Sequence, residues 1–241
     1  MIQTMKYRQP NILFLMTDQM QGRVLEDGHP CQTPHFDQLA AKGVRFPRAY
    51  TPNAVCSPAR ASLMTGLLPH SHGVLEVIHT VDGDQCNLRT EHPHWAQRLQ
   101  SAGYRTGYFG KWHVERSNDL RQFGWQVNGS VQTSMYREQQ RVLGTVKKDQ
   151  GSLILQKTDD YPPGFSSTLL YGVTNIRPEQ RGLCATTDLA RNFLQQVISD
   201  DSPWCCFVSL TEPHDPFVTG EAAFSQYEVD AIPLQPNVHN K

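Results

Sequence analysis

Short apolar runs that each end in polar residues recur along this chain. Residues 11–17 (NILFLMT) form a continuous apolar run that stops at Asp18. Such a run predicts a strand that is buried on both faces and carries a polar residue at its carboxyl end. Residues 204–210 form a similar apolar run, and residues 44–50 and 104–109 each follow a helical pattern, so we predict a strand in each of these three segments.

Helical patterns lie between these strands. Residues 33–43 open with an N-cap threonine followed by proline and end at glycine, which predicts a helix. Further helices are expected at 94–99, where a glycine follows at 103, and at 186–198, which is amphipathic. Strands that alternate with helices predict an α/β fold with a largely parallel sheet covered by helices on both faces.

The segment from about residue 115 to residue 183 follows a different pattern. It is polar, rich in glutamine, glycine and serine, and only weakly periodic. We therefore expect an irregular insertion of loops and short elements near the mouth of a site, where substrate preference usually resides.

Composition narrows the class of protein. The chain has 241 residues, a formal net charge of −1, 38% hydrophobic residues and 19% charged residues, which is typical of a globular protein. This balance gives no reason to expect a nucleic acid or a membrane as partner. The apolar run at 12–16 is too short for a secretory signal, so with Met1 as the start we expect a cytoplasmic protein.

Six cysteines stand at positions 31, 56, 86, 184, 205 and 206. In a chain of this length they do not form the dense, regular spacing of a disulfide framework, and no C-x-x-C spacing indicates zinc. We therefore expect reduced thiols, with Cys205 and Cys206 buried in a strand.

Polar residues that could take part in catalysis or binding follow the predicted strands. They are Asp18, the loop that carries Cys56, Lys111 with His113, and His214. In open α/β sheets functional groups gather at the carboxyl edge. Hydrolysis of a sulfate or phosphate ester needs a nucleophile, cations for the anion and an acid or base, and the chain supplies each type. Taken singly, these residues also fit structural roles: a turn aspartate, a solvated lysine or a hydrogen-bonded histidine.

One pentapeptide is more specific. Residues 56–60 (CSPAR) match C-x-P-x-R, the signal whose cysteine is oxidised to formylglycine in sulfatases, and they stand where a helix is expected to start near Pro58. Alone, the match also fits a structural cysteine before a helix. The order of the other motifs, PNILFLMTDQ, TPHFDQLAAKGVRF, CSPARASLMTG, GKWH and EPHDPF, resembles the sulfatase family over nearly the whole chain.

This resemblance implies a fold and a reaction. The fold would be an alkaline-phosphatase-like α/β/α sandwich with a largely parallel mixed sheet. A maturation enzyme would convert Cys56 to formylglycine, whose hydrate would attack the sulfur of a small-molecule sulfate ester and release the alcohol. Deprotonation of the second hydroxyl would then expel sulfate and restore the aldehyde.

The resemblance also implies roles for individual residues. Arg60 would orient the hydrate and offset its charge, and Lys111 would bind sulfate oxygens. His113 would be the base that expels sulfate, and His214 would contact the sulfate or the leaving oxygen.

A divalent metal, Ca²⁺ or Mg²⁺, is implied as well. Asp18, Gln19 and the modified Cys56 would be its ligands. Many sulfatases carry two adjacent aspartates where this chain has Asp18-Gln19, so one negative charge is absent. Choline-sulfatase-like and phosphonate-monoester-hydrolase-like branches have such an Asp-Gln start. A phosphonate monoester hydrolase or phosphodiesterase of the same superfamily is therefore an alternative.

Length is the other departure from the family pattern. Sulfatases are commonly longer and carry a further aspartate and lysine of the site after the EPHDPF motif. We therefore expect residues 1–241 to be the N-terminal part of a sulfatase catalytic domain, without the C-terminal subdomain and with an incomplete fold. By itself such a chain should be inactive or nearly so, and a non-catalytic remnant is a further alternative.

Overall fold

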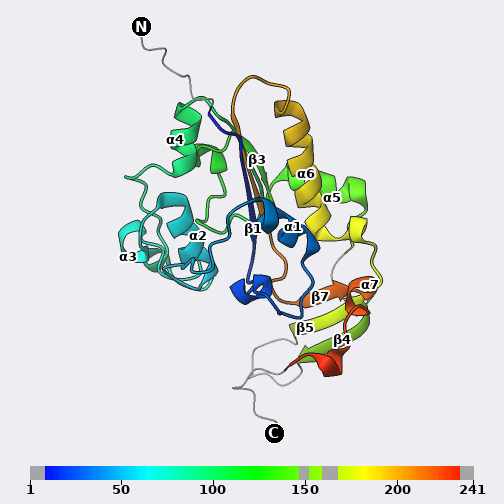
Figure 1. Ribbon diagram of the computed structural model, residues 1–241. Coiled ribbons are helices and arrows are strands. Elements are labelled where there is room, and N and C mark those ends of the chain that lie inside the picture. The colour runs from blue at the N-terminus through cyan, green and yellow to red at the C-terminus, as the bar shows by residue number, and fades with distance from the viewer. Residues whose placement is uncertain (1–8, 147–151, 159–167, 234–241) are drawn as a thin grey trace. The chain divides into compact units, whose positions relative to one another are not determined.

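The computed structural model describes residues 9–146, 152–158 and 168–233 (Figure 1). The chain forms two compact units. Of the described residues, the first unit contains 9–18, 50–145 and 182–212, and the second contains 19–49, 146, 152–158, 168–181 and 213–233. Each unit is therefore assembled from segments that lie far apart in the sequence.

A four-stranded parallel sheet organises the first unit. Its strands are in the order β1 (Ile12–Thr17), β6 (Trp204–Leu210), β2 (Arg105–Gly110) and β3 (Val127–Ser130). The strands predicted at 11–17, 104–109 and 204–210 are confirmed to within one residue at each end. Because neighbouring strands are parallel, their carboxyl ends meet at one edge of the sheet.

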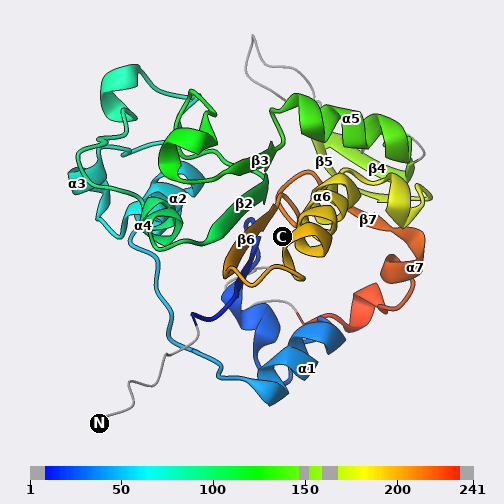
Figure 2. The same ribbon diagram turned by 90° about the horizontal axis from the view of Figure 1, so that it is seen from above.

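Helices cover both faces of this sheet, as the pattern predicted (Figure 2). On one face lie α5 (Ser134–Leu143) and α6 (Gly182–Val197). On the other lie α2 (Cys56–Thr65), α4 (Trp95–Ser101) and shorter turns, namely α3 (Pro69–His72), η2 (Gly83–Gln85) and η3 (Leu120–Phe123). The two apolar clusters follow the strand alternation, since Tyr108 and Phe207 belong to one and Phe109 and Val208 to the other.

β1 departs from its prediction, because it is an edge strand that is buried on one face only. Ile12, Phe14 and Met16 pack against the cluster under α2 and α4. Leu13 and Leu15 alternate with them and are 49% and 51% exposed. On their face α6 packs mainly against β6 and β2. The prediction of burial on both faces was therefore wrong.

Helix boundaries agree with the sequence signals except at α6. α2 begins at Cys56 and ends before Gly66, whose φ of 72° is the left-handed conformation common after helices. α4 starts one residue after the predicted position, and Gly103 follows it with φ of 89°. α6 starts at Gly182, four residues before its predicted start at Thr186.

The second unit contains α1 and a small mixed sheet. α1 (Pro34–Lys42) has Thr33 at the N-cap position and Gly43 at the C-cap, as predicted. In the sheet, β5 (Thr168–Thr174) pairs antiparallel with β4 (Ser152–Thr158) and parallel with β7 (Phe217–Gly220). Short turns complete the described part of this unit: η1 (Gly22–Leu25), η4 (Pro178–Gln180), α7 (Glu221–Phe224) and η5 (Val229–Ala231).

One sequence prediction, the strand at residues 44–50, is wrong. Residues 44–50 form no strand, and Val44, Phe46 and Tyr50 are 78%, 77% and 86% exposed. Pro47 interrupts this run and removes a backbone donor, which disfavours pairing. The short elements within the segment 115–183 are β3 and α5, which belong to the first unit, and β4 and β5, which belong to the second.

All six cysteines are free thiols, in agreement with the sequence prediction. Cys205 and Cys206 are fully buried in β6, and this burial raises the pKa of each thiol to about 12. Within the part of the chain that the structure describes, we find no helix of the length and apolarity needed to cross a bilayer.

Candidate active site

Three of the predicted site residues meet at the carboxyl edge of the parallel sheet. Lys111 Nζ lies 2.6 Å from Asp18 Oδ2, and Arg60 Nη2 lies 3.1 Å from the same oxygen. The side chains of Asp18, Arg60 and Lys111 are only 9%, 5% and 14% exposed. We call these three residues the Asp18 cluster. Asp18 follows β1 and Lys111 follows β2, so the parallel sheet brings their distant positions in the sequence together.

Arg60 connects the ends of three strands. Its Nη1 donates hydrogen bonds to the Lys111 carbonyl oxygen and to Ser209 Oγ, each at 2.8 Å, while Nη2 faces Asp18. The fixed fork of a guanidinium suits such multiple contacts. Ser209, which lies in β6 and is fully buried, was missed by the sequence analysis. Its signal was the polar residue next to the end of an apolar strand.

Gly110 determines how Lys111 enters the site. Gly110 has φ of 100°, and a Cβ placed there would lie 2.0 Å from the Ser209 carbonyl oxygen. Any side chain would therefore force the two strands apart. The Lys111 amide donates to the same Ser209 carbonyl at 3.0 Å, and Tyr108 Oη donates to the Lys111 carbonyl at 2.6 Å. The glycine of GKWH is thus required by the close approach of β6.

Cys56 is the first residue of α2 and is partly exposed. Arg60 lies four positions further along α2, so both residues are on the same face of the helix. Asn53 Oδ1 accepts a hydrogen bond from the Val55 amide at 2.7 Å and fixes the turn before the helix. The amides in the first turn of a helix favour negative charge, which suits a nucleophile that acts on an anion.

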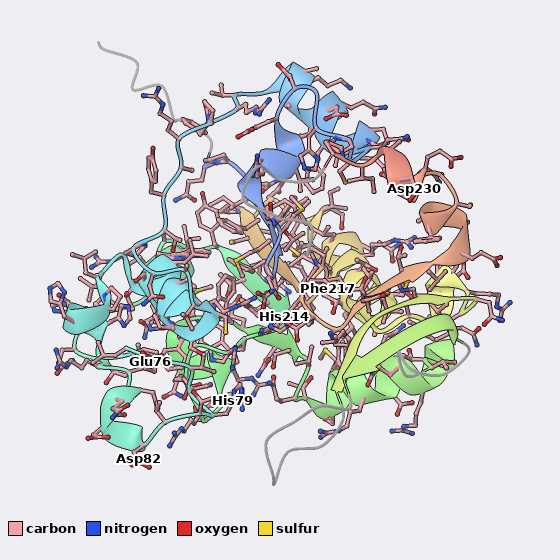
Figure 3. All side chains as sticks on the ribbon, turned by 90° about the horizontal axis from the view of Figure 1, so that it is seen from below. Glu76, His79, Asp82, His214, Phe217 and Asp230 are labelled. Carbon is pink, nitrogen blue, oxygen red and sulfur yellow. The ribbon has the colours of Figure 1, made fainter. Side chains whose placement is uncertain are left out.

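His113 lies two positions after Lys111 and adopts φ of 54°, an uncommon conformation for a residue other than glycine. Burial, followed by the positive charge of Lys111, lowers the pKa of His113 to about 4. The imidazole is therefore neutral at pH 7. Its Nε2 lies 3.0 Å from Nδ1 of His79, and the two rings are stacked with centroids 5.1 Å apart. His79, labelled in Figure 3, lies outside the motifs that the sequence alone singles out.

Gln19 and His214 belong to the second unit. Gln19 has φ of 63°, and its Oε1 accepts a hydrogen bond from the Asp215 amide at 3.3 Å. His214, labelled in Figure 3, has Nδ1 at 3.1 Å from Asp215 Oδ1. The structure therefore brings Gln19 together with the His214-Asp215 turn, and Asp18 together with Arg60 and Lys111.

The implied divalent metal can be tested against these donors. Asp18 offers a hard carboxylate oxygen, but Lys111 and Arg60 already share its Oδ2. Across residues 9–146, 152–158 and 168–233, no group of three or more histidine, cysteine, aspartate or glutamate residues is placed to hold a metal. Ca²⁺ and Mg²⁺ prefer six or more oxygen ligands. The described residues thus do not form a complete metal site by themselves. Asp18 is the one ligand that they would contribute to it.

A parallel sheet between helices, with an acid, two cations and a helix-borne cysteine at its carboxyl edge, defines an α/β protein of the alkaline-phosphatase-like class. The chain belongs to the sulfatase family, because the Sulfatase family profile matches residues 10–237. Among curated proteins it is 30% identical to choline-sulfatase of Rhizobium meliloti over 236 residues, which cover 95% of this chain. It is 28% identical to an ulvan-active sulfatase of Formosa agariphila over 96% of this chain.

Solved structures show the same fold. The phosphonate monoester hydrolase of Agrobacterium radiobacter matches 88% of this chain with a TM-score of 0.62 and 25% identity. A phosphonate monoester hydrolase of Silicibacter pomeroyi matches 96% of the chain with a TM-score of 0.69 and 21% identity. The predicted α/β fold class is thereby confirmed.

The relatives are much longer than this chain. The match covers 43% of the choline-sulfatase, 41% of the ulvan-active sulfatase and 43% of the Agrobacterium hydrolase. The chain therefore spans about two fifths of the length of these relatives, which agrees with the expected correspondence to part of a longer sulfatase.

Proposed function

We propose that this chain carries the nucleophile and the anion-binding side chains of a hydrolase that cleaves sulfate monoesters. The observation that carries the proposal is the Asp18 cluster, which lies at the carboxyl edge of the sheet and whose Arg60 shares α2 with Cys56. Choline-sulfatase and ulvan-active sulfatase, by name, act on sulfated compounds, which supports the substrate class.

The charge of the cluster favours an anion. Arg60 and Lys111 contribute two positive charges and Asp18 contributes one negative charge, so the cluster has a net charge of +1. Electrostatic attraction is strong in a largely buried site. Arg60 is held by four polar partners, so Lys111 is the cation that would turn toward a sulfate oxygen.

Cys56 would supply the nucleophile after oxidation to formylglycine, whose hydrate offers a hydroxyl that attacks sulfur. The partly exposed thiol at the start of α2 is compatible with access by a maturation enzyme. Arg60, on the same helix face, would orient the modified side chain and offset its charge.

His113 would act as the general base. Its lowered pKa keeps the imidazole neutral at pH 7, so its ring can accept a proton from a hydroxyl group. His214 would contact the sulfate or the leaving oxygen, and Gln19 would complement Asp18 with a neutral amide oxygen. No step here depends on Ca²⁺ or Mg²⁺, whose binding through Asp18 stays a prediction.

Two measurements test this proposal without requiring turnover by the chain alone. The first is a peptide mass spanning Cys56 from a host that modifies other C-x-P-x-R motifs, where conversion of the thiol to an aldehyde is expected. The second is the thermal midpoint in sulfate, with chloride at matched ionic strength as reference. Sulfate should raise the midpoint, and Lys111→Met should remove this effect while Lys42→Met, on α1, keeps it.

An unmodified Cys56 together with an unchanged midpoint in sulfate would reject the proposal and favour a non-catalytic remnant. Turnover of an aryl sulfate by the purified chain, lost in Cys56→Ala but kept in Cys31→Ala, would support the reaction. The same result would contradict the expectation that the chain is inactive by itself.

Phosphonate monoester hydrolysis is the second candidate. It is favoured by the likeness to the Agrobacterium enzyme and by Gln19, where many sulfatases have a second aspartate. Sulfate and phosphonate monoesters both present tetrahedral anions. A comparison of kcat/KM for aryl sulfate and aryl phosphonate substrates distinguishes the two candidates.

A further inference from the structure

His79 and His113 form a histidine pair beside the Asp18 cluster. His113 Nε2 lies 3.0 Å from His79 Nδ1, which is a hydrogen-bond distance, and their ring planes are inclined by only 23°. His79 is exposed, whereas the His113 ring is partly buried. His79 is thus the hydrogen-bond partner of His113 Nε2.

The other ring nitrogen of His113, Nδ1, differs from Nε2 in its surroundings. His113 Nδ1 is shielded from solvent and has no hydrogen-bond partner among the described residues. A buried polar atom without a partner costs free energy and calls for an explanation. Of the two ring nitrogens, Nδ1 is therefore the one whose hydrogen-bonding capacity is unused among the described residues.

The hydrogen bond to His79 determines what Nδ1 can do. A neutral imidazole carries one proton, so its two nitrogens have opposite roles. If His113 donates from Nε2 to His79 Nδ1, then His113 Nδ1 has a lone pair and can act as a base. If His79 donates instead, His113 Nδ1 carries the proton and cannot accept another.

The segment that bears His79 is fixed from both sides. Arg116 donates hydrogen bonds to the carbonyl oxygens of Ile78 and Val81, at 2.8 Å and 2.6 Å. Ser57 Oγ accepts a hydrogen bond from the Ile78 amide at 3.4 Å, and Ser57 directly follows Cys56. These contacts attach the loop to the first turn of α2 and limit where the His79 ring can move.

The charged groups around His113 favour the neutral ring. Lys111 and Arg60 repel an added proton, Asp18 attracts it more weakly, and protonated His79 would also repel it. His113 is thus suited to accept a proton transiently, provided that its tautomer is correct.

We propose that His79 is a positioning residue that accepts the Nε2 proton of His113 and thereby keeps His113 Nδ1 unprotonated as the base. The proposal rests on the proposed function of His113. In the base step, a hydroxyl proton moves to Nδ1 and its bonding electrons stay on the oxygen. His113 then carries one proton on each nitrogen, and its Nε2 proton remains bound to His79.

The test is a measurement of the His113 tautomer in the full chain. ¹⁵N-labelled protein at pH 7 gives separate imidazole nitrogen shifts for Nδ1 and Nε2. In the wild type, His113 should be protonated at Nε2 and unprotonated at Nδ1. His79→Phe removes the acceptor, so the His113 shifts should move toward a mixture of both tautomers.

A conservative variant and a control separate positioning from general damage. The side-chain oxygen of asparagine can occupy the place of His79 Nδ1, so His79→Asn should restore the Nε2 tautomer of His113. His92→Phe, at another exposed histidine of the same unit, should leave the His113 shifts unchanged. In protein that hydrolyses an aryl sulfate, His79→Phe should lower kcat by roughly 10- to 100-fold, the usual effect of removing an outer-shell partner of a functional histidine.

Two results would overturn the proposal. One is a wild-type His113 that is protonated at Nδ1, and the other is an unchanged Nε2 tautomer in folded His79→Phe. Failure of the proposed function would look different. In that case Cys56 stays unmodified and sulfate does not stabilise the chain, while the His113 tautomer still responds to His79→Phe.

Discussion

Lys111 Nζ lies 2.6 Å from Asp18 Oδ2, and both side chains are largely buried. The residues are 93 positions apart in the sequence, and they meet because β1 and β2 flank β6 in a parallel sheet. Arg60 shares the same carboxylate oxygen. One carboxylate oxygen thus contacts two cations, which makes Asp18 the electrostatic centre of the candidate site.

Removal of the Asp18 charge should strongly destabilise the fold. Asp18→Ala leaves Arg60 and Lys111 buried without their common partner, and such a loss typically costs about 3 to 5 kcal/mol. Asp200→Ala is the matched control, because Asp200 pairs with Arg105 at 2.9 Å in an exposed position. That change should cost about 1 kcal/mol or less. Urea unfolding of both variants gives the comparison, and equal losses would contradict a central role for Asp18.

Gly110→Ala should be poorly tolerated. The added methyl group would lie 2.0 Å from the Ser209 carbonyl, in a backbone conformation that L-residues rarely adopt. We expect a loss of roughly 3 kcal/mol or more in the free energy of unfolding. Gly22→Ala provides the control, since nothing lies within 4 Å of a Cβ there. If both variants unfold at the same denaturant concentration, the close approach of β2 and β6 is wrong.

The low pKa of His113 should depend on Lys111. Burial is the main cause and the Lys111 charge is the next, so Lys111→Met should raise the His113 pKa from about 4. An NMR titration of the His113 ring measures this change directly. Lys42→Met, which removes a charge from α1, should leave the titration unchanged. A His113 pKa that does not rise in Lys111→Met would show that the Lys111 charge does not lower the His113 pKa.

His94 should make the fold sensitive to acid. His94 is 1% exposed, and its ring stacks on Phe123 with the ring centroids 4.4 Å apart. Burial lowers its pKa from the ordinary 6.5 to about 4. Between these values the unfolded chain binds the proton and the folded chain does not, so stability is present above pH 6.5 and decreases as the pH falls toward 4.

His94→Phe should remove this contribution, which amounts to about 3 kcal/mol between pH 6.5 and 4. The measurement is the free energy of unfolding of wild type and variant across that pH range. The exposed His92→Phe should follow the wild type. Parallel curves for wild type and His94→Phe would rule out a neutral buried His94.

Native-state alkylation should distinguish the cysteines. The pKa values of Cys205 and Cys206 are raised to about 12 and both are fully buried, so neither should react with iodoacetamide in the folded chain. Unmodified Cys56, which is partly exposed, should react. Mass spectrometry of the labelled peptides at increasing urea gives the order of reaction. Labelling of Cys206 before Cys56 would contradict the burial of β6.

Local sequence patterns predicted much of the architecture. The apolar runs 104–109 and 204–210 became β2 and β6, and the threonine, proline and glycine at 33–43 marked the ends of α1. These signals are reliable because periodicity, capping and glycine conformations act within a few residues. The run at 44–50 failed, since a strand also needs a partner that the local pattern does not specify.

The features of the candidate site also fall into two groups, those set by the local sequence and those set by the tertiary structure. The sequence by itself determined that Cys56, Arg60, Lys111 and His113 follow recognisable motifs, because residue type and spacing are local properties. Only the tertiary structure decided that Lys111 and Arg60 share Asp18, that Ser209 fixes Arg60, and that His79 holds His113. These contacts join segments of the chain far apart in sequence. They depend on strand order and loop packing, which no short motif encodes.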